Sequence, residues 1–335
     1  RVGPQSAGSE PGPACYGRAG ADATVTDANL ILGRLEPTLS GKFDLDMDAA
    51  EAVVSQVAEQ IGLSTLEAAE SIIAICCENM AQAVKLVLID RGRDPRDFVL
   101  ASFGGAGPMH ACAIARSMSI PKVIVPANAG VASAFGAIAM DLRHDLEDFY
   151  YGDVAAADFD RLNQLYESLE ARGRELLMRD GVAAEHMSLS RNAQMRYTGQ
   201  FWEVSAPIPS ETLSEGSVAT ILDSFHKAHE TEHGVCSPSF PVEFVSIGLT
   251  ANGQFSTEPE LEVVNQASSD AISGMRDVYF DGTWVPVSVY SGAELGSGSA
   301  VQGPAIIEYP HFETVLPKDT SAEVDRVGNL IVSVG

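Results

Sequence analysis

The chain has 335 residues, of which 45% are hydrophobic and 20% are charged, as in an ordinary globular protein of about two or three domains. Its formal net charge of -25 argues against polyanionic partners, so we expect neither nucleic acid nor a membrane surface to bind it. No apolar run long enough to span a bilayer and no signal peptide are expected. Five scattered cysteines indicate reduced thiols and a cytoplasmic location.

The first forty residues are rich in glycine and proline, which excludes a regular element but allows an ordered loop. Within this stretch Asp27 precedes a short apolar segment. It is either the N-cap of a short helix or a polar group that points at a ligand, and the cap is the simpler interpretation.

Two helices are predicted next. Apolar residues at helical spacing indicate one helix over residues 46–61 and a second from Ser64 to about residue 90. Ser64 and Glu67 have the spacing of a capping box at the start of the second helix. Two adjacent cysteines, Cys76 and Cys77, point in different directions on this helix, so we interpret them as core packing.

The stretch from Phe98 to Cys112 combines a short apolar run, a glycine turn and an alanine-rich helical pattern. It predicts a strand, a tight turn at Gly104-Gly105-Ala106-Gly107 and a helix that ends near residue 118. Glycines admit a ligand close to the backbone, and the first turn of a helix offers free N–H groups to an anion or a polar ring edge. A close strand–helix junction without a ligand explains the spacing equally well.

Further along the chain, residues 121–126 predict a buried strand and residues 129–140 a helix of small residues. Strand, helix, strand and helix in succession are typical of an α/β layer. We therefore expect three regions: an α/β region over 1–143, an α+β region over 144–255 and a region of short strands over 256–335. The predicted elements after the first region are strands over 142–151, 187–208 (two) and 242–250, helices over 156–180 and 216–233, a loop over 255–275, and short strands over 277–334.

Three histidines share one face of the predicted helix over 216–233, because His226, His229 and His233 are spaced by three and four residues. Three imidazoles could bind zinc. No acidic fourth ligand with an evident role accompanies them, so we interpret them as a stripe that faces solvent or an interface, and we expect no metal site.

A fourth histidine, His110, lies near the start of the helix behind the glycine turn, where the helix dipole favours a neutral ring. A neutral imidazole can act as a base or form a hydrogen bond to a ribose or phosphate. It can equally form a hydrogen bond to a carbonyl elsewhere in the domain. No nucleophile elbow, Walker loop or dinucleotide fingerprint is visible.

Five blocks of sequence, in order along the chain, resemble the hydantoinase A / oxoprolinase family, which includes the large subunits of acetone and acetophenone carboxylases. Each block alone is weakly specific, but together they cover essentially the whole chain. The blocks are Gly3–Gly8 with Pro11–Gly17, Thr24–Asn29 with Leu32–Leu35, Phe103–Ala111, Arg196–Gln200, and Gly303–Glu308 with Gly328–Leu330.

The resemblance implies an α/β fold of the actin, sugar-kinase and heat-shock-chaperone ATPase type, followed by a smaller α+β, strand-rich C-terminal region. It implies ATP and Mg²⁺ as cofactors. The site residues that it implies are Gly104, Gly105, Ala106, Gly107 and Asn29 for cofactor binding and Asp27 and His110 for catalysis.

The chain departs from the family pattern in two ways. Family members carry two phosphate loops of the Asp-x-Gly-Gly-Thr type upstream, and this sequence has neither. We therefore expect it to be the C-terminal half of a larger subunit, with the loops on an N-terminal half or a partner chain, and to hydrolyse ATP poorly alone. The segment Tyr309–Glu313 is bulkier than the small, Ser/Thr-rich segment usual in the family.

The function implied by the resemblance is a component of an ATP-dependent amide-ring hydrolase of the hydantoinase/5-oxoprolinase type, which phosphorylates a carbonyl oxygen of a small cyclic amide. One alternative is a subunit of an ATP-dependent ketone carboxylase, because the same activation serves a ketone. Another is a nucleotide-binding scaffold without catalysis. Both enzymes would need a hydantoinase B-like partner subunit, so we expect a hetero-oligomer.

Overall fold

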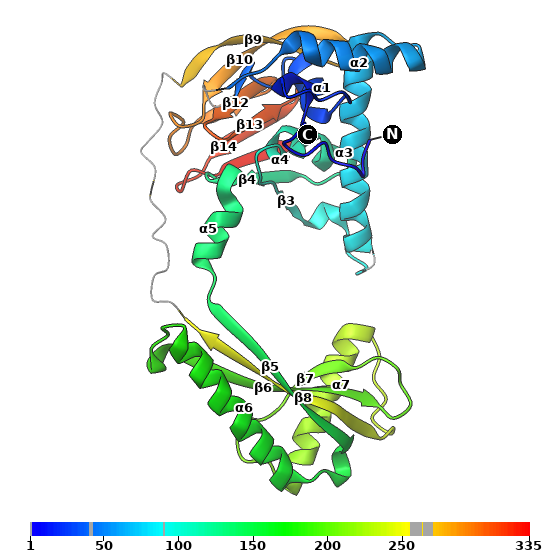
Figure 1. Ribbon diagram of the computed structural model, residues 1–335, viewed down its shortest axis with the longest axis vertical. Helices are drawn as coiled ribbons and strands as arrows, with labels where there is room; N and C mark the ends of the chain where they lie inside the picture. The colour runs from blue at the N-terminus through cyan, green and yellow to red at the C-terminus, as the bar shows by residue number, and fades with distance from the viewer. Residues whose placement is uncertain (1, 40–42, 90, 255–262, 264–270) are drawn as a thin grey trace. The chain divides into compact units, whose positions relative to one another are not determined.

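The computed structural model describes the chain apart from residues 1, 40–42, 90, 255–262 and 264–270 (Figure 1). It has two compact units: unit 1 combines Arg1–Ala137 with Leu261–Gly335, and unit 2 is Ile138–Glu260. The three-region division at residues 143 and 255 stays a prediction about domains, but by contacts the C-terminal strands belong to the same unit as the first part of the chain. Most of the predicted loop over 255–275 lies outside the described residues.

Three helices of unit 1 pack against one another around its main apolar core: α1 (Val25–Ile31), α2 (Met47–Ile61) and α3 (Thr65–Ile89). The side chain of Asp46 caps α2 by accepting a hydrogen bond from the backbone of Ala49, and α2 ends at Gly62 in the left-handed conformation. The helix predicted over residues 46–61 is therefore confirmed.

The capping box at the start of α3 is also confirmed. Glu67 accepts hydrogen bonds from both the backbone and the hydroxyl of Ser64, and the Glu67 backbone donates to Ser64 Oγ. Further along α3, Cys77 is buried and Cys76 is partly exposed, so the two thiols point in different directions as predicted. All five cysteines are free.

One helix among the described residues, α3, is long and apolar enough to cross a membrane by length and composition. The expectation that the chain has no such segment is therefore wrong. The buried core helix of a globular protein passes the same test. One side of α3 packs against α1, α2 and α4 within unit 1, but only 17% of its most apolar 18-residue window is buried. This finding alone is weak support for a membrane.

A five-stranded sheet carries the glycine turn of unit 1, with strand order β11-β14-β15-β4-β3. The strands β3 and β4 are parallel and joined through helix α4, as expected for an α/β layer. Beside them, the last strand of the chain pairs antiparallel with β4, so that Val332 lies opposite Val123. The bounds are β3 (Val99–Ala101), α4 (Gly107–Ser117), β4 (Lys122–Val125), β11 (Ala300–Gln302), β14 (Thr320–Val324) and β15 (Leu330–Val334).

A second sheet of unit 1 has the order β13-β12-β10-β9, and α4 packs against β13. Its strands are β9 (Ile272–Phe280), β10 (Thr283–Ser291), β12 (Ala305–Tyr309) and β13 (Phe312–Leu316). The remaining elements of this part are β1 (Thr38–Leu39), β2 (Phe43–Asp44), α5 (Ala132–Ala139) and the short 3-10 helices η1 (Ala14–Tyr16), η2 (Pro95–Asp97) and η3 (Ala129–Val131). The series of short strands predicted for the C-terminal region is confirmed.

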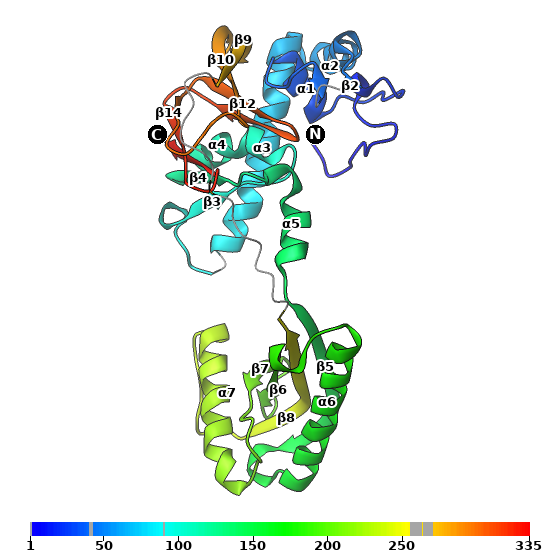
Figure 2. The same cartoon turned by 90° about the vertical axis from the view of Figure 1, so that its left-hand side faces the viewer.

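Unit 2 is an antiparallel sheet with the order β5-β8-β6-β7 and two helices that share one apolar core with it (Figure 2). Gly173 lets helix α6 lie close to the sheet, because a Cβ atom there would be 3.1 Å from the Ala251 side chain. The elements are β5 (Leu142–Asp153), η4 (Val154–Ala156), α6 (Phe159–Arg179), η5 (Ala184–His186), β6 (Met187–Tyr197), β7 (Val204–Pro207), η6 (Glu215–Ser217), α7 (Val218–His233) and β8 (Val242–Gly253). The mixed α/β class with a strand-rich C-terminal region is thus confirmed.

Candidate functional site

The glycine turn lies between the end of β3 and the start of α4. The Gly104 backbone donates a hydrogen bond of 2.7 Å to Ala129 O, which ties the turn to the segment after β4. Gly104 has a φ of 87°, in the left-handed region that favours glycine. Gly105 and Ala106 are exposed, and no side chain caps the N-terminus of α4. The turn therefore presents bare backbone to solvent. The first turn of α4 adds few donors, because Pro108 has no N–H and the Met109 N–H already donates to Ala106 O at 3.2 Å.

The turn between β12 and β13 lies against the glycine turn, although the two are far apart in the sequence. A Cβ atom on Gly105 would be 3.5 Å from His311 O, and a Cβ atom on Gly130 would be only 2.7 Å from the His311 Cβ. Gly130 thus permits the approach by having no side chain. The imidazole of His311 is exposed. His311 and Gly130 are site residues that the sequence analysis did not assign, although it singled out the bulk of the segment around His311.

Asp27 is fully buried and holds the N-terminal loop to α1. Its carboxylate accepts hydrogen bonds from the backbones of Cys15 (2.8 Å) and Thr24 (2.9 Å) and from the Thr24 hydroxyl (2.6 Å). The N-cap of α1 is Thr24, and Asp27 closes the capping box from the third helical position. The prediction that Asp27 is the cap is therefore wrong by three residues. Contacts directed into the unit favour a positioning role for this carboxylate.

Asn29 is also buried on α1, where its amide group donates a hydrogen bond of 3.0 Å to Val25 O. In the part of the chain that the structure describes, no hydrogen bond joins Asp27 or Asn29 to the glycine turn. The assignment of Asn29 to cofactor binding stays a prediction.

His110 lies in the core between α4 and α3. Its Nδ1 atom is 3.5 Å from Cys77 Sγ. Burial, followed by the nearby Arg34 guanidinium, lowers the pKa of His110 to about 4. Burial also raises the pKa of the Cys77 thiol to about 11. Burial thus favours the neutral ring expected for His110, and a catalytic role for this residue stays a prediction. A neutral thiol beside a neutral imidazole favours core packing over nucleophilic catalysis.

The histidines of α7 do share one face, because Tyr197 contacts the rings of His226 and His229, and the rings of His229 and His233 are 4.7 Å apart. The interpretation of a stripe that faces outward is wrong for His229, which is buried. Its Nδ1–H donates to a backbone carbonyl at 2.7 Å, and its Nε2 accepts from Gln200 at 3.1 Å. Since both ring nitrogens are engaged, His229 has no lone pair left for a metal.

Among the described residues, one group of acidic, histidine or cysteine side chains is close enough to share a metal ion: Glu36, Glu308 and Glu313. Arg276 already lies among them. Its guanidinium pairs with Glu308 and lies 3.6 Å from Glu313 Oε2. We interpret the group as a partly buried ion cluster that joins β9, β12 and β13. Burial raises the pKa of Glu313 to about 7.

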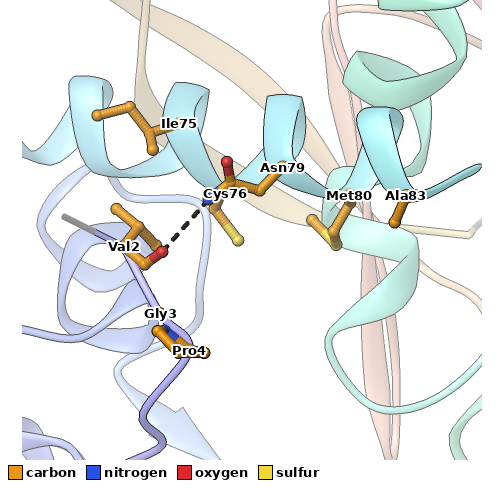
Figure 3. Close-up of a pocket in the computed structure, with 8 residues that line it drawn as sticks. All are labelled: Val2, Gly3, Pro4, Ile75, Cys76, Asn79, Met80 and Ala83. Atoms are coloured by element: carbon orange, nitrogen blue, oxygen red, sulfur yellow. Dashed lines mark hydrogen bonds between the residues drawn. The ribbon is translucent and has the colours of Figure 1, made fainter. Parts of the chain in front are cut away.

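A hollow of about 710 Å³ lies beside α3, near the start of the chain (Figure 3). Asn79 donates a hydrogen bond of 3.3 Å to Val2 O across it. The other side chains around the hollow, such as Ile75 and Met80, are apolar, and none of its lining residues is charged. We assign no chemistry to it.

Replacing Asp27 with asparagine tests whether this residue holds the loop or takes part in catalysis. In Asp27→Asn an amide group would face backbone N–H donors, so we expect the free energy of unfolding to fall by about 2 kcal/mol. Chemical denaturation of the purified chain measures this change, with Asp22→Asn in the same loop as a control. Unchanged stability with lost activity of the assembly would instead support a catalytic Asp27.

The ion cluster predicts a specific dependence of stability on pH. Glu313 has a pKa of about 7 in the folded chain and an ordinary value of 4.5, so its contribution to stability is complete below about pH 4.5 and is lost as the pH rises through 7. Glu313→Gln removes this titration and keeps an oxygen for the Glu36 N–H. We expect the stability of wild type relative to the variant to fall by on the order of 2 kcal/mol between about pH 5 and pH 8.

Urea unfolding at each pH checks this expectation. Glu323→Gln replaces an exposed glutamate of β14 and serves as the control. A difference between wild type and Glu313→Gln that stays constant over this pH range would contradict the assignment.

Two family models match consecutive parts of the chain. The hydantoinase/oxoprolinase model matches residues 1–146, and the hydantoinase/oxoprolinase C-terminal domain model matches residues 152–330. Together they cover both units.

Individual relatives agree with this assignment. The caprolactamase subunit alpha of Pseudomonas jessenii is 34% identical over 97% of this chain and 48% of that protein. The acetophenone carboxylase gamma subunit of Aromatoleum aromaticum is 32% identical over 99% of this chain and 47% of that protein. The crystal structure of the ATP-dependent caprolactamase from Pseudomonas jessenii matches with a TM-score of 0.78 at 33% identity, over 99% of this chain and 50% of that chain. The chain spans about half the length of these relatives, and it belongs to the hydantoinase/oxoprolinase family.

Proposed function

We propose that this chain supplies the adenosine-binding part of an ATP-dependent enzyme that opens an amide ring. The observation that carries the proposal is the exposed backbone of the glycine turn at the start of α4, in a chain that resembles an ATP-dependent caprolactamase over nearly all its length. Backbone without side chains lets a purine ring approach closely.

The surroundings of the turn fit a nucleoside. A Cβ atom on Gly105 would meet only His311 O within 4 Å, so the backbone is open on its other sides. The ring of Phe103 is 57% exposed and offers an apolar surface beside the turn. The imidazole of His311 can donate or accept a hydrogen bond to a ribose or a base.

The phosphates and Mg²⁺ need other residues. The described acidic group of Glu36, Glu308 and Glu313 already contains an arginine, which disfavours a metal there. We propose that residues in the half of the relatives' length that this chain does not cover hold the phosphates and the metal. The chain alone would then bind nucleotide and turn it over poorly.

In this proposal ATP supplies the phosphoryl group that activates a carbonyl oxygen of a small cyclic amide, so that water can attack the carbonyl carbon. Unit 1 of this chain binds and orients the adenosine. A hydantoinase B-like companion subunit completes the reaction. We also propose a cytoplasmic location, with which the free cysteines agree.

A ketone carboxylase is the second candidate, because the identity to an acetophenone carboxylase subunit, 32%, is close to the 34% identity to a caprolactamase subunit. Activation of a carbonyl oxygen suits both reactions. A scaffold that binds nucleotide without turnover is the third candidate.

ADP release by the intact native assembly distinguishes the three candidates. We expect ring opening of 5-oxoproline, a hydantoin or a lactam to be coupled to ADP release, without dependence on bicarbonate. Release driven by a simple ketone, with carbon fixed from bicarbonate, would favour the carboxylase. Bound ATP without release for any of these substrates would favour the scaffold.

Gly105→Val tests the glycine turn directly. A branched side chain at this exposed position would stand between the backbone and the nucleotide, so we expect the Kd for ATP to rise at least about tenfold, equivalent to about 1.4 kcal/mol. Equilibrium binding of a fluorescent ATP analogue to the native assembly measures it. Gly274→Val on β9, where a Cβ atom also has open space, is the matched control. Equal affinity for ATP in the two variants would show that the glycine turn is not part of the nucleotide site.

A further inference from the structure

A partly buried polar network in unit 2 joins one loop to one turn. The turn after β6 and the loop 234–241 after α7 meet where the Thr198 backbone donates to Pro241 O at 2.9 Å. The Tyr197 hydroxyl accepts a hydrogen bond of 2.7 Å from the Ser237 backbone and lies 2.8 Å from His226 Nδ1. The hydroxyl can accept from the Ser237 backbone and donate its own hydrogen to His226 at the same time. Burial lowers the pKa of His226.

A second arm of the network runs through His229. This buried ring accepts from Gln200 at 3.1 Å and donates to Val235 O at 2.7 Å, so it joins the turn to the loop. Arg196 is outside this network and pairs with Glu243 at 2.7 Å. Within the Arg196–Gln200 motif, singled out in the sequence, Tyr197 and Gln200 therefore act as a clamp that joins the turn to the loop.

Four large apolar side chains on or next to the joined turn and loop are exposed to solvent. We call them the apolar rim: Phe201 is 78% exposed, Trp202 72%, Val235 62% and Phe240 60%. The rings of Phe201 and Trp202 pack edge to face at 5.0 Å. Exposed aromatic side chains that gather on a rigid support are typical of contact sites between proteins, and tryptophan is enriched among the residues that dominate binding energy.

We propose that the apolar rim is the docking surface for the companion subunit, through an apolar pocket bordered by lysine or arginine. The formal charge of -25 makes two copies of this chain repel each other, which disfavours self-association. Exposed glutamates, Glu230 and Glu232, lie on the last turns of α7. Glu203 directly follows Trp202, and its carboxylate lies 3.8 Å from Arg196 Nη1. A basic border on the partner would complement them. The existence of a companion subunit rests on the proposed function.

The chain has two tryptophans, so Trp284→Phe leaves Trp202 as its single tryptophan. The chain is labelled with 5-hydroxytryptophan, which can be excited apart from ordinary tryptophan, and is mixed with the unlabelled hydantoinase B-like subunit from the same source. We expect acrylamide to quench Trp202 strongly in the chain alone and several-fold less in the complex. Quenching that is weak in the chain alone, or unchanged by the subunit, would overturn the proposal.

Point variants test whether the companion subunit binds the apolar rim or another part of unit 2. Trp202→Ser should weaken binding of the companion subunit about thirtyfold, as expected for a dominant contact. Met178→Ser, at a side chain that is 59% exposed on α6, is the control and should leave binding unchanged. Tyr197→Phe keeps every rim side chain but removes the hydroxyl of the clamp, and a weaker complex is expected from it too.

Other outcomes would contradict the proposal. Equal loss in Met178→Ser and Trp202→Ser would show a general effect of destabilising unit 2, and self-association of the chain that Trp202→Ser abolishes would identify a second copy as the occupant. ATP binding by the same assemblies separates the two hypotheses. If the companion subunit protects Trp202 from acrylamide but the assembly does not bind ATP, the docking surface is supported and the nucleotide site is refuted. If the assembly binds ATP but Trp202 is not protected, the nucleotide site is supported and the docking surface is refuted.

Discussion

The candidate site depends on the pairing of β15 with β4. This pairing places the last strand of the chain beside the strand that follows the glycine turn, with Leu330 opposite Val125 and both side chains buried. The C-terminal sheet then packs on α4 through β13, and the turn that carries His311 comes against Gly105 and Gly130. Without the pairing of β15 with β4, the turn that carries His311 would not lie against the glycine turn.

Much of the fold could be predicted from the sequence because its signals are local. The capping box of Ser64 and Glu67, the end of α2 at a glycine and the strand–turn–helix around Gly104 are each encoded within a few residues. The site needed contacts between distant segments. No spacing rule connects His311 to Gly130 or Arg276 to Glu313, so their proximity is known only from the structure.

Two errors of the sequence analysis have physical causes. Asp27 has the composition of an N-cap, but Thr24 precedes it and takes that role, which leaves the carboxylate free to bind the N-terminal loop. The sequence analysis expected no run long enough to span a bilayer, because polar residues such as Glu78 and Lys85 interrupt the apolar ones, but α3 has the length and mean hydropathy of such a run. Composition alone does not distinguish a lipid-facing helix from one that packs against protein.

Unit 2 shows how a motif can be visible in the sequence while its role is not. Tyr197 and Gln200 were singled out by resemblance, and the histidines of α7 by their spacing, but only the fold shows that they bond to one another. These side chains have a structural role, because their hydrogen bonds join the turn and the loop that carry the apolar rim. The acidic surface and the rim together describe the kind of partner that would fit.

The most direct test of the nucleotide site is hydrogen–deuterium exchange of the native assembly with and without bound ATP. The account predicts slower exchange with ATP in residues 103–107 and 129–131 and in the turn of residues 309–312, because the nucleotide would cover all three segments. Bound ATP that leaves exchange in these segments unchanged, while it slows exchange elsewhere, would contradict the account.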